Sequence, residues 1–102
     1  MIEQVIQYGT ELNVRDESGR TIANVGVGYG TELEGWSEDF IVLRNGNQVY
    51  TIDERGYQIG FLNLSESAAR VQGVTASGFG IRTGSFVQRY DESCRPTHSM
   101  NV

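Results

Sequence analysis

The sequence predicts an all-β fold made of three imperfect antiparallel meander units. Three observations lead to this prediction. Short segments rich in Val, Ile, Tyr and Phe alternate with turn residues. A set of positions recurs about every 38 residues, and the chain contains 13 Gly but only one Pro. Only residues 65–70 suit a single helical turn. The length of 102 residues predicts one domain, residues 1–102.

The repeat is marked by the dipeptide Asp-Glu, which begins at Asp16, Asp53 and Asp91, at intervals of 37 and 38 residues. A glycine lies seven residues before each pair, and an aliphatic residue lies three residues to either side of that glycine. The glycines are Gly9, Gly46 and Gly84, and the aliphatic residues are Ile6, Leu12, Leu43, Val49, Ile81 and Val87. Because several positions keep one register, chance explains them poorly, and we predict units at residues 1–38, 39–76 and 77–102.

The middle unit shows the expected elements most completely. Its four strands are expected at residues 40–44, 48–52, 57–64 and 69–74. Asn45-Gly46 predicts a type I′ hairpin turn between the first two strands, because both central residues of that turn need positive φ. Asp53 and Gly56 predict a second turn, in which the aspartate bonds its own backbone and the glycine takes a left-handed conformation.

The first unit follows the same order, whereas the third departs from it at the second turn. Cys94 stands where the other two units have glycine. Since cysteine adopts positive φ reluctantly, this turn is expected to differ from the others. Pro96 removes a backbone donor, which predicts an edge strand or a chain end. Met100 and Val102 keep the register of the third strand, so the tail is expected to add that strand and to lack a fourth.

Three architectures suit units of this size. A β-trefoil or another small barrel would close the units around a threefold axis. Propeller-like blades close in sets of about four to eight, so three blades would be completed by oligomerisation. An open meander sheet would leave exposed edges, which also favour association. We therefore expect a homo-oligomer.

The hairpins resemble those of known β-repeat proteins. The segments at residues 49–56 (Val-Tyr-Thr-Ile-Asp-Glu-Arg-Gly) and 87–94 (Val-Gln-Arg-Tyr-Asp-Glu-Ser-Cys) are similar to the Tyr-Asp hairpins of bacterial YD-repeat and propeller-like proteins. They also resemble hairpins of short bacterial β-repeat proteins. The resemblance implies a structural or interaction role and transfers no catalytic residue.

Charge is unevenly distributed along the chain. The net charge is −5, every base is an arginine, and residues 1–39 carry −6 against +2 for residues 40–89. Nonspecific nucleic-acid binding needs cationic contacts to phosphate, so nucleic acid is not an expected partner. The asymmetry would suit head-to-tail self-association. Cys94 is the only cysteine, and we see no secretory signal or membrane-spanning run, so we expect a cytoplasmic protein without an internal disulfide.

Five residues are candidates for binding. Trp36, Tyr29 and Tyr57 lie near expected turns or strand ends, where aromatic rings with polar neighbours can form a platform for a sugar or a peptide. The alternative for Trp36 is that it caps the core between units. Arg44 and Arg82 precede two hairpin turns at matching positions, which would suit a stripe for an anion or a partner. The alternative is that both are solvated hairpin side chains.

Three other motifs are better explained as structure than as chemistry. Each Asp-Glu turn offers two carboxylates, whereas Ca²⁺ takes about six to eight oxygens. Cys94 and His98 have no second Cys or His to complete a metal site. The glycines at 26, 28 and 30 lack the spacing and the following helix of a dinucleotide-binding loop. We therefore expect no metal and no cofactor.

The function predicted from these observations is a non-enzymatic binding or protein-interaction module that self-assembles. Two alternatives remain open at this level. One is a small lectin-like carbohydrate-binding protein that uses the aromatic candidates. The other is an enzyme whose carboxylate site forms between neighbouring chains.

Overall fold

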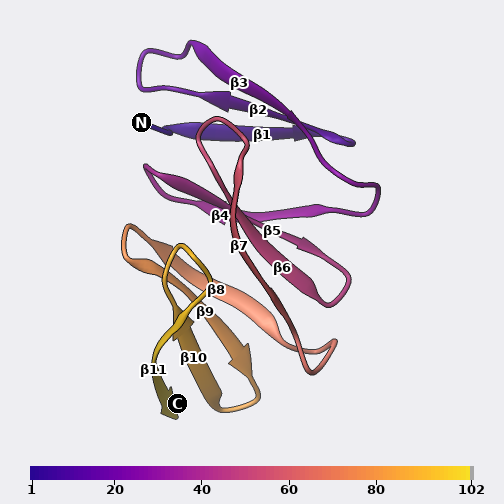
Figure 1. Ribbon diagram of the computed structural model, residues 1–102, viewed down its shortest axis with the longest axis vertical. Coiled ribbons are helices and arrows are strands. Elements are labelled where there is room, and N and C mark those ends of the chain that lie inside the picture. Colours follow the sequence, from indigo (N-terminus) through magenta and orange to yellow (C-terminus); the bar gives the residue numbers. More distant parts are fainter. Residues whose placement is uncertain (102) are drawn as a thin grey trace.

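Figure 1 shows the computed structural model, which describes residues 1–101 as strands joined by turns and loops. The strands are β1 (Gln4–Tyr8), β2 (Glu11–Arg15), β3 (Thr21–Gly26), β4 (Glu32–Trp36), β5 (Phe40–Asn45), β6 (Gln48–Asp53), β7 (Gln58–Asn63), β8 (Arg70–Thr75), β9 (Gly78–Thr83), β10 (Phe86–Tyr90) and β11 (Pro96–Asn101). They form three antiparallel sheets, and none of the three closes into a barrel. The all-β prediction is confirmed. No helix among the described residues is long and apolar enough to cross a membrane.

The second and third sheets begin one strand earlier than the sequence units. Sheet 1 has the strand order β1-β2-β3, sheet 2 has β4-β5-β6-β7, and sheet 3 has β11-β10-β9-β8. The strand expected to end the middle unit is β8, and it pairs forward with β9. In the same way, β4 pairs with β5. The third sheet therefore has four strands, and the first sheet is the one that has three.

Connection length explains this grouping. Residues 37–39 join β4 to β5 and residues 76–77 join β8 to β9, whereas six residues, 64–69, separate β7 from β8. Short connections favour antiparallel hairpins between consecutive strands. The long connection instead carries the chain from one sheet to the next, and it contains a hydrogen-bonded turn, Ala69 N to Glu66 O at 3.2 Å, rather than a helix.

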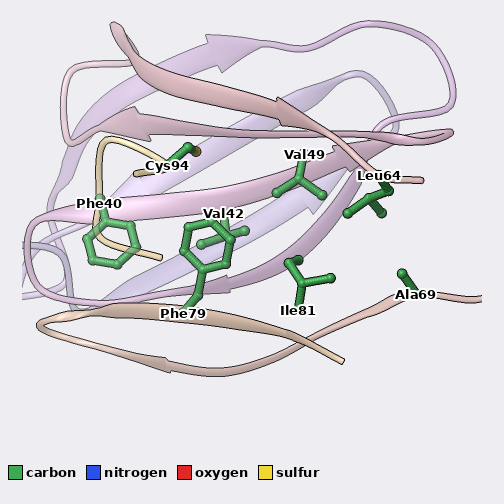
Figure 2. Close-up of a cluster of buried hydrophobic side chains, with 8 residues drawn as sticks. All are labelled: Phe40, Val42, Val49, Leu64, Ala69, Phe79, Ile81 and Cys94. Carbon is green, nitrogen blue, oxygen red and sulfur yellow. The ribbon is translucent and has the colours of Figure 1, made fainter. Parts of the chain in front are cut away.

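The sheets stack face to face, and the two layers between them form the core (Figure 1). Strand β5 lies at the centre of this stack, with Phe40, Ile41, Val42 and Leu43 fully buried. Phe40 and Val42 belong, with Phe79, to the cluster shared with sheet 3 (Figure 2). Phe79 stacks on Tyr90. Ile41 and Leu43 belong to the cluster shared with sheet 1. Burial on both faces explains why this strand is a continuous apolar run.

The three Asp-Glu turns have the same geometry, which corrects the prediction for the third. In each, the Asp side chain accepts from the backbone N–H two and four residues later; for Asp91 the distances are 2.9 Å from Ser93 and 3.0 Å from Arg95. Cys94 adopts a φ of 63°, in the region that glycine occupies in the other two turns. Left-handed backbone costs a non-glycine residue about 1–2 kcal/mol. Burial of the Cys94 side chain in the cluster between sheets 2 and 3 offsets this cost.

The type I′ turn predicted at Asn45-Gly46 in the middle unit is also wrong. The two residues between β5 and β6 are Gly46 and Asn47, rather than Asn45 and Gly46. Gly46 has a φ of 61°, while Asn47 is not among the residues with positive φ. This combination is typical of a type II′ turn, which needs glycine only at its first central position. Asn45 is free to end β5, where its amide donates to the Thr31 hydroxyl at 3.1 Å.

Each later Asp turn rests on the preceding sheet. The turn containing Ser93 lies against β7 so closely that a Cβ at Gly60 would overlap the Ser93 carbonyl. The buried Thr51 hydroxyl donates to the Glu92 carbonyl of the same turn. In sheet 2, Gly56 lies against Val25 of sheet 1. The tail forms β11 at the edge of sheet 3, as Pro96 and Met100 predict, while Val102 lies outside the described residues.

Candidate functional site

The most distinctive feature of the molecule is the free edge of β1. By sequence register, β1 corresponds to β5 and β9, because Ile6, Leu43 and Ile81 occupy matching positions. Strand β4 covers one edge of β5 and β8 covers the same edge of β9. Among the described residues, β1 pairs only with β2. Sheet 1 is therefore complete except for one strand at this edge.

The turn geometry shows which backbone groups face the gap. Tyr8 and Glu11 are the closing pair of a two-residue hairpin, and such a pair is hydrogen-bonded. Pairs alternate along an antiparallel ladder, so the N–H and C=O groups of Gln7 and Val5 point away from β2. At the far end of the gap, the Glu3 carbonyl accepts from the indole nitrogen of Trp36 at 3.2 Å. The open part of the edge is centred on Val5, Ile6 and Gln7.

Strand β1 also lacks the features that protect the other edges. The six edge strands are β1, β3, β4, β7, β8 and β11. Five of them pair with a register shift that marks a bulge, and only β1 keeps an unbroken register with its neighbour. Its five residues, Gln-Val-Ile-Gln-Tyr, contain no charge, proline or glycine. Bulges, charges and proline at edges prevent strand addition, so β1 is the edge best suited to accept a strand.

Three equivalent side chains brace the ends of the sheets. Gln7, Arg44 and Arg82 each donate to the carbonyl of the glycine in their own hairpin, at 3.0, 2.9 and 2.9 Å. Gln7 also donates to the Thr31 carbonyl at 2.7 Å, and Arg44 donates to the Ala69 carbonyl, in the segments that lead into the next sheet. Among residues 1–101, the Arg82 side chain donates only to the carbonyl of Gly84 in its own hairpin. Arg44 therefore links sheet 2 to the segment that leads into sheet 3, whereas Arg82, at the matching position of sheet 3, is exposed.

The three aromatic candidates lie in three different segments. Trp36 ends β4, is half-buried and packs on the cluster between sheets 1 and 2. Tyr29 is 93% exposed in the connection after β3, and Tyr57 is 70% exposed in the turn after β6. None of the three lines any of the best-defined cavities. The structure does not bring them together with Arg44 and Arg82 into one site.

Two of the cavities differ in the charge of their linings. One of about 310 Å³ contains Glu32, Glu34, Arg44 and Arg70. Burial, and then the neighbouring Glu32, raise the pKa of Glu34, while the two arginines oppose this shift. Two acids facing two guanidinium groups form a balanced charge cluster. A cavity of about 300 Å³ between sheets 2 and 3 is lined by both apolar and polar groups. The described residues contain no group of three acidic, His or Cys side chains that could hold a metal ion.

A smaller cavity, of about 200 Å³, lies between the Asp turns of sheets 1 and 2. Its lining includes Glu17 and Glu54. The amino group of Met1 pairs with Glu54 at 2.9 Å, and this contact raises the pKa of the amino group. The N-terminus therefore joins sheet 1 to the turn of sheet 2.

The Cys94 thiol is a core group. It is 8% exposed, lies 3.7 Å from the Thr51 hydroxyl, and burial raises its pKa. A reactive thiol needs a lowered pKa and access to solvent. His98, on the edge strand β11, is exposed. The two residues therefore do not form a nucleophilic pair.

No family model, curated protein or solved structure matches the chain.

Proposed function

We propose that this protein is a non-enzymatic protein-interaction module whose partner adds an extended strand to β1. The observation that carries the proposal is the three-stranded sheet 1, beside two sheets in which β4 and β8 fill the corresponding edge position. Strand addition supplies affinity through main-chain hydrogen bonds, which need no particular side chains on the accepting strand. The open N–H and C=O groups of Val5 and Gln7 provide them.

The outer faces of the stack favour a partner at the β1 edge over the stacking of sheets from a second chain. On the outer face of sheet 1, Asn13 and Arg15 stand where sheet 2 has Tyr50 and Ile52 against the core. Asn13 donates to Asn24 at 3.0 Å and accepts from Arg15 at 2.7 Å. The centre of this face is therefore polar and hydrogen-bonded, as in the terminal repeats of solenoid proteins, while Ile6 is an apolar residue at its β1 edge.

The outer face of sheet 3 is closed by a different device. Arg89 occupies the position of the buried residues Val14 and Thr51. Its side chain crosses Gly80 and donates to the Gly73 carbonyl at 2.8 Å. Because neither end presents an apolar face like those inside the stack, these faces do not favour the association of blades from two chains.

The two alternative functions have weaker support. A carbohydrate platform would use adjacent aromatic rings, but the stacked ring pair among the described residues is Phe79–Tyr90, which includes none of Trp36, Tyr29 and Tyr57. A carboxylate enzyme would need acids in a cavity of their own, but Glu32 and Glu34 share theirs with two arginines. The acids of the smaller cavity share it with Arg55 and with the Met1 amino group, which pairs with Glu54. An interaction at the β1 edge requires neither arrangement.

The test is a chain that carries its own extra strand. A five-residue strand of alternating Thr and Val would be joined to the N-terminus through a flexible Gly/Ser linker, which gives an effective concentration of the order of millimolar. The control has the same linker and strand with Pro at the central position. We expect slower amide hydrogen exchange at Val5 and Gln7 and a higher Tm than in the control. Equal exchange in the two chains would contradict the proposal.

A further inference from the structure

We infer that the strand accepted by β1 runs antiparallel to it and has the pattern apolar–any–Gly–apolar, with the first apolar residue opposite Ile6. This inference rests on the proposed function and specifies its partner. The pattern is shared by the two strands that fill the equivalent position. It is Leu-Glu-Gly-Trp at residues 33–36 of β4 and Val-Gln-Gly-Val at residues 71–74 of β8.

The register of both strands fixes the position of the first apolar residue. In sheet 2, Leu33 lies opposite Leu43, and in sheet 3, Val71 lies opposite Ile81. Both pairs face the preceding sheet, where they contribute to the core. Ile6 is the counterpart of Leu43 and Ile81 and is half-buried without a fourth strand beside it. Sheet 1 has no preceding sheet in the described structure, so an apolar residue opposite Ile6 would cover it by cross-strand contact alone.

The glycine of the pattern has a packing reason. A Cβ on Gly35 of β4 would lie 2.9 Å from a methyl group of Val74, which belongs to the first strand of the following sheet. Trp36 is the counterpart of Val74 one sheet earlier. The indole of Trp36 already reaches the Glu3 carbonyl at the gap. Since an indole is larger than an isopropyl group, glycine at this position of the strand beside β1 avoids an overlap, and a strand without it should bind more weakly.

Charge favours the β8 version of the pattern. Residues 1–39 carry a net charge of −6. The β4 strand contains Glu32 and Glu34, whereas the β8 strand contains Arg70 and no acid. A strand with a basic residue before the first apolar position would therefore associate faster and hold more tightly at low salt. The expected partner is an extended, uncharged or basic polypeptide segment with a central glycine.

The chain itself offers the probe and the reporter. The capped peptide Ala-Ala-Arg-Val-Gln-Gly-Val-Thr, equivalent to residues 68–75, lacks tryptophan, and Trp36 is the only tryptophan in the protein. Titration of this peptide into the full chain would be followed by Trp36 emission and by amide exchange at Val5 and Gln7. The control peptide carries Gly73→Val, which adds a side chain under the indole and places a β-branched residue where β8 has a φ of 60°.

We expect saturable binding with a shift of Trp36 emission and protection of Val5 and Gln7. The Gly73→Val peptide should bind about tenfold more weakly, as expected for overpacking a formed contact. In the protein, Ile6→Lys should abolish binding, while Ile22→Lys, at a 38% exposed residue on the bulged edge strand β3, should leave it unchanged.

Two results would overturn the inference. The first is absence of peptide binding while the chain with its own Thr/Val strand still protects Val5; the edge would then accept strands without this pattern, and the proposed function would stand. The second is equal or tighter binding of the Gly73→Val peptide, which would remove the packing argument at Trp36. Failure of both the peptide and the attached strand would reject the proposed function as well.

Discussion

Sheets 1 and 2 carry the same register of turns and apolar residues but differ at one edge. In sheet 2, β4 covers β5, and the polypeptide backbone of β5 is paired on both sides. In sheet 1, β1 has the same position but a neighbour on one side only. The difference shows that two sheets with the same register of turns and apolar residues can differ in the pairing of one backbone edge. The unpaired edge of β1 is therefore the feature that distinguishes sheet 1 from sheet 2.

The comparison extends to how each sheet is braced. Arg44 of sheet 2 reaches the carbonyls of Ala69 and Ser67, whereas Gln7 of sheet 1 binds both the Thr31 carbonyl and the Leu33 amide. The Gln7 amide ties β4 to sheet 1 at the side of the gap. Sheet 1 is therefore held to its neighbour through side chains, while its own fourth position remains open.

The largest expected effect distinguishes the covered strand from the open one. Leu43→Ala in β5 removes a fully buried side chain and should cost about 2–5 kcal/mol. Ile6→Ala, at the matching position of β1, removes a half-buried side chain and should cost about 1 kcal/mol. Chemical denaturation of both variants provides the comparison. Equal losses would show that β1 is as fully enclosed as β5.

The next effect concerns the contact between an Asp turn and the preceding sheet. Gly60→Ala should destabilise the fold by about 1–3 kcal/mol, because the new Cβ overlaps the Ser93 carbonyl. Sheet 1 has Ala23 at the same register position. Ala23→Gly is therefore the matched control, with a loss limited to about 1 kcal/mol from strand propensity and lost burial. Thermal unfolding of the pair would decide, and a harmless Gly60→Ala would mean that this turn does not rest on β7.

Much of the fold is readable from the sequence because it is encoded locally. The Asp turns at residues 16, 53 and 91 follow from the preference of Asp and Gly for turn positions, and the strands follow from their β-forming residues. The assignment of strands to sheets is not local. A periodic chain has no intrinsic starting point, so strand β8 fits the end of one unit as well as the start of the next. The discriminating signal is the short connection at residues 76–77 compared with residues 64–69.

The candidate site was harder to predict for the same reason. Sequence reasoning looks for side chains that bind, and it selected Trp36, Tyr29, Tyr57, Arg44 and Arg82. The edge of β1 is a property of backbone pairing, which becomes visible only once the sheets are assigned. Trp36 borders this edge through its bond to Glu3. The turn at Cys94 keeps the geometry of the other two, against its prediction, because its side chain is buried against the neighbouring sheet. A local sequence pattern does not show that burial.

A smaller effect separates the two arginines that occupy equivalent positions. Arg44→Ala should cost about 1–3 kcal/mol, because it removes charge-assisted bonds to three backbone carbonyls and leaves part-buried acceptors without a partner. Arg82→Ala removes a contact to its own hairpin and should leave stability unchanged within error. Urea unfolding midpoints would show this contrast. A large loss at Arg82 would reveal a role that residues 1–101 of a single chain do not explain.

The smallest expected effect is a pH dependence of stability at Cys94, the residue that replaces the glycine of the other two Asp turns. Burial raises the pKa of the Cys94 thiol above its value in the unfolded chain. The unfolded state therefore loses its proton first as pH rises above the ordinary thiol value of about 8.5. By linkage, the neutral thiol contributes stability that is complete below that pH and declines above it. Cys94→Ala cannot titrate, so the stability difference between wild type and this variant should shrink between pH 7 and pH 9.5 in urea unfolding. A constant difference would show that the thiol ionises equally in both states and that its burial is incomplete.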